Sequence, residues 1–229
     1  MTKLKVYLKY FLYLLHLRTT IPAYFINKKC IRENGEGFVD LRSYPKLFFD
    51  ASFDGKPVLI RAGVADKLHY AQSLLPKHLF LKVLSAYRSM KDQEKLYQFY
   101  YAEMQKNYPQ LTAIDWERMT KAICANPKSG GGGHQTGGAV DITLCDECGK
   151  ELDMGTRYLE MDTKTPTHAS DISPVSQQNR ALLCHVLNMA DMQNYPNEWW
   201  HFCYGDRMWA TYKRKKYAIY GVVRQAHLD

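Results

Sequence analysis

The stretch SGGGGHQTGGAVDITL, residues 129–144, holds the most distinctive pattern in the chain. Four glycines precede His134, and a second pair of glycines follows it closely. Glycine allows unusual backbone angles and a close approach of the backbone to a ligand, so this loop predicts a histidine placed at a binding site. The residues that follow alternate, which is typical of a β-strand that turns Val140 and Ile142 one way and Asp141 the other.

Two further stretches predict strands. The apolar run at residues 79–87 is bounded by polar residues, which fits a buried strand, and the aromatic-rich run at residues 199–204 fits another. Strands and helices do not alternate as regular βαβ units in this sequence. We therefore predict an α+β fold: a single domain with a central, mostly antiparallel sheet and flanking helices.

Helical periodicity occurs on both sides of the quoted stretch. Apolar residues recur at helical spacing over residues 90–106 and 176–192, which predicts an amphipathic helix in each range. Between them, Asp115 is predicted to cap a helix that runs to about residue 125, where Asn126 and Pro127 stop it.

Length and composition suit one globular domain with a sizeable core. The chain has 229 residues, of which 46% are hydrophobic. Its net charge is +8, from 31 basic and 23 acidic residues. The densest basic cluster, residues 213–216, fits a solvated charged surface better than a nucleic-acid interface, which needs basic residues interleaved with exposed aromatics on one face. We expect no nucleic-acid partner.

The N-terminal segment has a character of its own. Residues 1–35 are expected to form an apolar and basic extension, and residues 36–229 the catalytic domain. Three lysines precede an apolar run at residues 10–17, which is too short to span a bilayer. The small-residue cleavage site of a secretory signal is poorly matched. An uncleaved signal-like segment, a membrane-surface helix and a packed extension all remain open, and so does membrane association through this segment.

Six cysteines occur, and two of them form the only C-x-x-C motif, Cys145 and Cys148. A single such pair is a weak zinc signal. It lies between a predicted strand and Gly149, so we interpret it as a turn with incidental cysteines. A local disulfide is the second interpretation and a structural metal the third.

A second histidine with unusual neighbours is His201, in Glu198-Trp-Trp-His201. Together, His134, Asp141 and His201 provide two imidazoles and a carboxylate, a set typical of a catalytic zinc that keeps one position for water. Glu198 would then lie near that water as general base, at the end of a loop. The alternative is that His134 is an ordinary loop residue, Asp141 a polar residue on the face of a strand and His201 a packed aromatic neighbour. Spacing alone leaves both interpretations open.

Arg88 follows the predicted strand at residues 79–87 directly. A fixed cation at the junction of strand and loop could stabilise the oxyanion of a tetrahedral intermediate. A surface arginine paired with a carboxylate is the alternative.

These motifs resemble those of a known family. The spacing His134-x6-Asp141 and the segment Glu198-Trp-Trp-His201 resemble the zinc motifs of the D-alanyl-D-alanine dipeptidases, part of a wider group of zinc D,D-peptidases that includes D,D-carboxypeptidases and phage endolysins. The segment Ser85-Ala-Tyr-Arg88 resembles the Tyr-Arg motif of that group. The sequence MGTRY at residues 154–158 resembles a stretch more particular to the dipeptidases. The likeness spans about residues 38–204.

The resemblance implies one Zn²⁺ per chain, bound by His134, Asp141 and His201. It implies Glu198 as catalytic base and proton shuttle, and Arg88 as the group that stabilises the transition state. The implied reaction is hydrolysis of the small dipeptide D-alanyl-D-alanine to two D-alanines, in cell-wall peptide turnover or glycopeptide resistance. The alternatives are a D,D-carboxypeptidase or endolysin-like peptidase on peptidoglycan stem peptides, and a zinc-binding domain without catalysis.

The sequence departs from the family pattern at three places, one of which is the stretch Asp40-Leu-Arg42, where only the first half of the family's pattern is matched. Gly132 stands where the family usually has serine, and Ser89 where it usually has proline. These changes concern substrate recognition rather than the metal ligands, so selectivity between the dipeptide and longer stem peptides stays open. The family analogy favours a cytoplasmic location, whereas the N-terminal apolar run and the cysteine count favour the cell envelope. The oligomeric state is not indicated.

Overall fold

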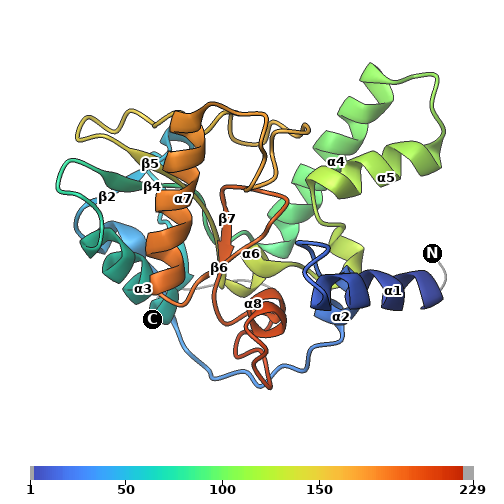
Figure 1. Ribbon diagram of the computed structural model, residues 1–229, viewed down its shortest axis with the longest axis horizontal. Coiled ribbons are helices and arrows are strands. Elements are labelled where there is room, and N and C mark those ends of the chain that lie inside the picture. Colours follow the sequence, from blue (N-terminus) through green and yellow to red (C-terminus); the bar gives the residue numbers. More distant parts are fainter. Residues whose placement is uncertain (1–2, 224–229) are drawn as a thin grey trace.

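The computed structural model describes residues 3–223 (Figure 1). Residues 1–2 of the expected extension and residues 224–229 of the expected catalytic domain lie outside the described residues. A sheet occupies the centre, two helices cover one side of it, and a helical hairpin and the N-terminal helices lie toward the opposite end of the molecule.

Within residues 3–223, the central sheet has five strands in the order β2-β4-β5-β7-β6. The pair β2–β4 is parallel and the other three pairs are antiparallel. A separate antiparallel pair, β1–β3, lies outside this sheet. The predicted α+β fold with a mostly antiparallel sheet is therefore confirmed. The strands are β1 (Phe38–Asp40), β2 (Leu47–Phe49), β3 (Leu59–Arg61), β4 (Phe80–Ser85), β5 (Ala139–Cys145), β6 (Gln193–Asn194) and β7 (His201–Cys203).

The helices surround this sheet. Helices α3 and α7 pack against each other and against the sheet, α4 and α5 form the hairpin, and α2 packs on α8. They are α1 (Lys3–Leu14), α2 (Ala23–Asn27), α3 (Ala62–Ser73), α4 (Met90–Asn107), α5 (Ala113–Ile123), α6 (Gly133–Thr136), α7 (Pro174–Met189) and α8 (Arg207–Tyr212). Short 3₁₀ turns occur at η1 (Leu41–Ser43), η2 (Ala51–Phe53) and η3 (Pro127–Ser129).

The helix expected at residues 90–106 is confirmed as α4, and the one expected at 176–192 as α7, with shifted ends. Helix α7 begins earlier because the Ser173 hydroxyl accepts the backbone N–H of Ser176 and Pro174 occupies the first turn. It ends earlier because Asp191 adopts a left-handed backbone, with φ of 61°.

The prediction that Asp115 caps α5 was wrong. Thr112, not Asp115, is the N-cap residue: its hydroxyl accepts the N–H of Asp115, and the Asp115 carboxylate accepts the N–H of Thr112. Asp115 therefore occupies the third helical position of a capping box, a place where a carboxylate also satisfies a backbone donor.

Strand β5 lies in the middle of the sheet and is buried on both faces. Val140 and Ile142 join the same apolar core as Leu68 of α3 and Leu183 of α7. Burial of apolar surface contributes about 25 cal/mol per Å², so this core holds the two helices on the sheet. The strand expected at residues 79–87 is confirmed as β4, whereas the one expected at 199–204 is shorter, because a turn occupies its first two residues.

The C-x-x-C motif forms the predicted turn after β5. The Asp146 carboxylate accepts the backbone N–H groups of Cys148 and Lys150. Cys145 is buried as the last residue of β5, Cys148 is exposed, and both are free thiols, so the interpretation as a local disulfide was wrong.

The N-terminal extension packs on the domain through short helices. The backbone N–H of Ile21 donates to the hydroxyl of Tyr212, in α8, at 3.0 Å. Among residues 3–223, no helix has the length and apolar character needed to cross a membrane.

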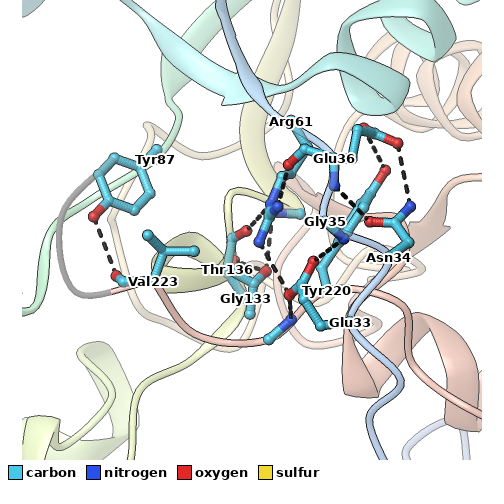
Figure 2. Close-up of polar contacts among 12 residues, drawn as sticks. Glu33, Asn34, Gly35, Glu36, Arg61, Tyr87, Gly133, Thr136, Tyr220 and Val223 are labelled. Atoms are coloured by element: carbon cyan, nitrogen blue, oxygen red, sulfur yellow. Dashed lines mark hydrogen bonds and ion pairs between the residues drawn. The ribbon is translucent and has the colours of Figure 1, made fainter. Parts of the chain in front are cut away.

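A buried arginine ties several distant segments together (Figure 2). Arg61 is 4% exposed; its Nε donates to the carbonyl of Thr136 at 2.9 Å, and its Nη groups reach the carbonyl of Glu36 and, at 3.1 Å, the carboxylate of Glu33. The hydroxyl of Tyr220 donates to the Glu36 carboxylate at 2.8 Å. Thr136 belongs to α6, at the end of the segment that carries His134, which we call the histidine loop (residues 129–136). The contacts of Arg61 with Glu33, Glu36 and Thr136, which we call the arginine clamp, act with the Tyr220 hydrogen bond to fix segments near both ends of the chain to this loop.

Replacing Arg61 with methionine is expected to lower the free energy of unfolding by about 2–3 kcal/mol, because buried acceptors lose a charged donor while the apolar stem is kept. Urea-induced unfolding measures the change. Arg118→Met is the matched control: Arg118 forms an exposed ion pair with Asp115, and its loss should cost less than about 1 kcal/mol. Equal losses from the two variants would contradict the role of the clamp.

Candidate active site

His134 is placed by the glycines before it. Gly130 and Gly131 have φ of 91° and 84°, in the left-handed region that favours glycine. A Cβ at Gly133 would lie 2.6 Å from a carboxylate oxygen of Asp206, so no larger residue fits there without displacement. The loop then enters α6, whose second residue is His134. The Nδ1 atom of His134 lies 2.8 Å from the Ala86 carbonyl, and this contact assigns its proton to Nδ1 and leaves Nε2 as an electron-pair donor.

Asp141 and His201 are brought together by strand pairing. They lie directly opposite each other on β5 and β7. The Oδ1 atom of Asp141 is 2.9 Å from Nδ1 of His201 and 3.3 Å from Nε2 of His134. The three residues therefore converge, which their spacing in the sequence had left open.

The charges of these three groups are strongly coupled. Burial alone would raise the pKa of Asp141, but His134 and His201 together hold it well below its usual range. Burial also disfavours a charged His201, yet the hydrogen bond and charge of Asp141 raise its pKa to about 8. An ionised carboxylate in this position is stable only because donors surround it.

The donor set fits a zinc ion. One ligand atom from each of His134, Asp141 and His201 lies within 4.8 Å of the other two, and no other group of three such side chains converges in this way among residues 3–223. Two imidazole nitrogens and one carboxylate oxygen match a catalytic zinc site with an open position. The hydroxyl of Tyr158 donates to Oδ2 of Asp141 at 2.7 Å, so that Oδ1 remains directed at the histidines.

Glu198 lies in the turn between β6 and β7, as expected for a residue at a loop end. Its backbone N–H donates to the Tyr195 carbonyl at 3.0 Å, and the Asn194 amide donates to the carbonyls of Glu198 and His201, both at 3.1 Å. Burial raises the pKa of the Glu198 carboxyl to about 7, with the Asp141 charge adding to the effect and His201 opposing it. A carboxyl group of this pKa suits proton transfer near neutral pH.

Arg88 follows β4 and is held by neutral partners. One Nη atom donates to Gln93 and the other to the Ser85 hydroxyl, both at 3.0 Å. No carboxylate pairs with Arg88 among the described residues, so the alternative of a surface ion pair was wrong. Its backbone N–H donates to the His134 carbonyl at 3.2 Å, which joins the two loops.

One cavity of about 230 Å³ contains every residue that the sequence singled out for chemistry. Helices α4 and α5 form one wall of it and the turn before β7 another. Its lining includes the predicted residues Arg88, His134, Asp141, Glu198 and His201.

No role was predicted for the groups that support this cavity, although Tyr158 ends the MGTRY stretch at residues 154–158. Gln93 is 2% exposed; besides accepting from Arg88 it accepts from the Gln135 amide at 3.0 Å and donates to the Ala125 carbonyl at 2.7 Å. Tyr158 lies in a segment without regular structure. The one signal available for Gln93 was a polar residue within an amphipathic helix, which has no specific meaning by itself.

A protein-family model matches most of the chain. The family model described as D-ala-D-ala dipeptidase matches residues 51–220. A D-alanyl-D-alanine dipeptidase of Synechocystis sp. is 30% identical over 228 residues, which cover 83% of this chain and 90% of the relative. The D-alanyl-D-alanine dipeptidase of Escherichia coli is 38% identical over 72 residues, which cover 31% of this chain and 37% of that one.

Solved structures resemble the chain more distantly. VanYB in complex with D-alanine-D-alanine has a TM-score of 0.43 and 19% identity, over 65% of this chain and 72% of that chain. The LD-carboxypeptidase LdcB has a TM-score of 0.44 and 22% identity, over 79% of this chain and 73% of that chain.

Removing one of the three converging side chains should impair metal binding. His201→Ala is expected to lower the zinc content well below one per chain after zinc loading and dialysis, because only two donors remain. Elemental analysis by mass spectrometry measures this. His185→Ala, at an exposed histidine of α7, should keep the wild-type zinc content; an unchanged content in His201→Ala would remove this residue from the ligand set.

Proposed function

The chain belongs to the D-Ala-D-Ala dipeptidase family, and we propose that this zinc-dependent peptidase hydrolyses the dipeptide D-alanyl-D-alanine to two D-alanines. The observation that carries the proposal is the single cavity that holds two histidines, two carboxylates and an arginine. Its volume of about 230 Å³ lies below the range of about 300–1,000 Å³ found for drug-sized ligands, and so suits a small substrate.

The proposed zinc ligands are His134, Asp141 and His201. Bound there, zinc supplies Lewis acidity toward a peptide carbonyl and a water molecule. The protein's own part in holding the site is to fix the tautomer of His134 through the Ala86 carbonyl and the direction of Asp141 through Tyr158.

Glu198 is the proposed general base. Its carboxylate takes a proton from the attacking water and returns it to the nitrogen of the departing amine, so that one group serves both transfers. Burial, which raises its pKa, increases its basicity for the first transfer and keeps the acid form accessible for the second.

Arg88 is the proposed stabiliser of the oxyanion. Its guanidinium group lines the cavity and is held by Ser85 and Gln93, which are neutral. Its charge is therefore not neutralised by a neighbouring carboxylate and remains available to the negative oxygen that develops in the transition state.

A second candidate is hydrolysis of longer peptides that end in D-Ala-D-Ala. A neighbouring cavity of about 320 Å³ shares Gly132, Gly133 and His201 with the first. This added space would accommodate further residues of a peptidoglycan stem peptide. Turnover of cell-wall peptides or glycopeptide resistance is the proposed setting for either activity.

Glu198→Gln should retain one zinc per chain and lose at least about 100-fold in kcat, because the amide cannot accept the proton of water. Release of D-alanine from D-Ala-D-Ala measures the rate. Glu147→Gln, at an exposed glutamate in the turn after β5, is the matched control and should leave the rate unchanged. Turnover by Glu198→Gln at the wild-type rate would exclude the proposed base.

One assay distinguishes between the two candidate substrates. The zinc-loaded protein is expected to release D-alanine from D-Ala-D-Ala and to act far more slowly on a pentapeptide that ends in D-Ala-D-Ala, because the cavity at the ligands is small. Faster cleavage of the pentapeptide would establish the second candidate. No release from either peptide would contradict both.

A further inference from the structure

Helix α1 packs on the domain through one of its faces only. Val6 is 8% exposed. The ring of Tyr10 stacks on Phe25 with centroids 4.1 Å apart, and the ring of Tyr13 meets Tyr212 of α8 edge-on at 5.8 Å. These residues recur at helical spacing, so they form one continuous inner face.

The opposite face of α1 is apolar and uncovered. Leu4 is 80% exposed, Leu8 and Phe11 are each 55% exposed, and Leu15, just beyond the helix, is 50% exposed. Their spacing of four, three and four residues places them on one stripe, which we call the outer face. A contiguous apolar stripe of this kind marks an interaction surface. Because the inner face already holds the helix in place, folding of this domain does not require the outer face to be apolar.

The charge around this stripe has one sign. No acidic residue occurs before Glu33, whereas seven basic residues do. Successive residues on a helix are about 100° apart, so the exposed Lys3 and Lys5 flank Leu4 on opposite sides. The remaining basic residues of this segment are Lys9, Arg18, Lys28, Lys29 and Arg32.

A second basic cluster lies close to the same helix. Residues 213–216 follow Tyr212, the residue that contacts α1. Lys29, after α2, donates to the carbonyl of Lys215 at 2.7 Å. Arg214 and Lys216 are exposed and form no ion pair among the described residues. The surface around α1 therefore combines an apolar stripe with positive charge from two parts of the chain.

We propose that α1 binds the surface of an anionic lipid bilayer. The outer face enters the boundary between headgroups and acyl chains, and the lysines that flank it contact lipid phosphates. Pairing with a second copy is disfavoured, since a symmetric contact brings this basic surface against itself. Ile26 and Asn27 of α2 line the neighbouring cavity of about 320 Å³, which also includes His201. One helix, α2, therefore separates the membrane-bound α1 from that cavity.

Co-sedimentation of the full chain with lipid vesicles tests this proposal. The protein is expected to bind vesicles that contain phosphatidylglycerol, to bind pure phosphatidylcholine vesicles much more weakly, and to dissociate as salt is raised. Equal binding to both vesicle types, or binding to neither, would overturn the proposal.

Two sets of variants separate the apolar and the basic contributions. Leu8→Glu with Phe11→Glu should weaken binding at least tenfold, because two large apolar side chains no longer leave water. Lys3→Gln with Lys5→Gln should weaken binding to phosphatidylglycerol vesicles by about fivefold per lysine. Ile114→Glu, at a residue of α5 that is 77% exposed, is the control and should bind as the wild type does.

All these positions are exposed and lie outside the catalytic cavity, so release of D-alanine from D-Ala-D-Ala by the variants serves as the check on folding. A dimer that Leu8→Glu with Phe11→Glu dissociates in size-exclusion chromatography, without vesicle binding by the wild type, would assign the outer face to a second copy and overturn the proposal. Vesicle binding itself is measured without substrate, and if the dipeptide is not hydrolysed, far-UV circular dichroism replaces D-alanine release as the check on folding.

Discussion

A nearly buried carboxylate, Asp141, sets the constraint on which the rest of the site depends. An ionised group that is removed from water must be surrounded by donors, and here they come from separate parts of the chain. His201 reaches it across the strand pair β5–β7, His134 from the glycine loop, and Tyr158 from an irregular segment. Strand order, loop conformation and the path of the irregular segment must all be correct before this carboxylate is satisfied.

Arg88 illustrates a different solution for a charge at the same site. It is held by the neutral groups of Ser85 and Gln93 rather than by a carboxylate. Gln93 in turn contacts Gln135, whose side-chain oxygen accepts the backbone N–H of Gly132. The guanidinium group and the glycine loop are thus positioned by one hydrogen-bonded chain, which limits their movement without cancelling the positive charge. Fixed charge of this kind stabilises a transition state without reorganisation during the reaction.

The sequence predicted those parts of the structure that rest on local pattern. Alternation identified β5, helical periodicity identified α4 and α7, and the glycine-flanked histidine identified the loop at the site. Spacing could not establish that His134, Asp141 and His201 converge, because that depends on which strand pairs with which. It also could not assign a role to Tyr158, although the MGTRY stretch that contains it was recognised. This segment has no periodicity and is held instead by buried Arg180, which donates to the carbonyls of Met154, Lys164 and Pro166. The cap of α5 was misassigned because Thr112 and Asp115 both satisfy the composition of a helix start, and only the backbone geometry distinguishes them.

The arginine clamp has a consequence for biosynthesis. Arg61 and the glutamates around it connect α6 to Tyr220 and Gly221, residues that leave the ribosome after all the catalytic groups. A nascent chain that has just completed His201 holds every proposed ligand, yet its histidine loop still lacks the support that Tyr220 and Gly221 provide through Glu33 and Glu36. A polypeptide that terminates after His201 would therefore carry all the ligand residues without the hydrogen bonds of Tyr220 and Gly221 to Glu36 and Glu33.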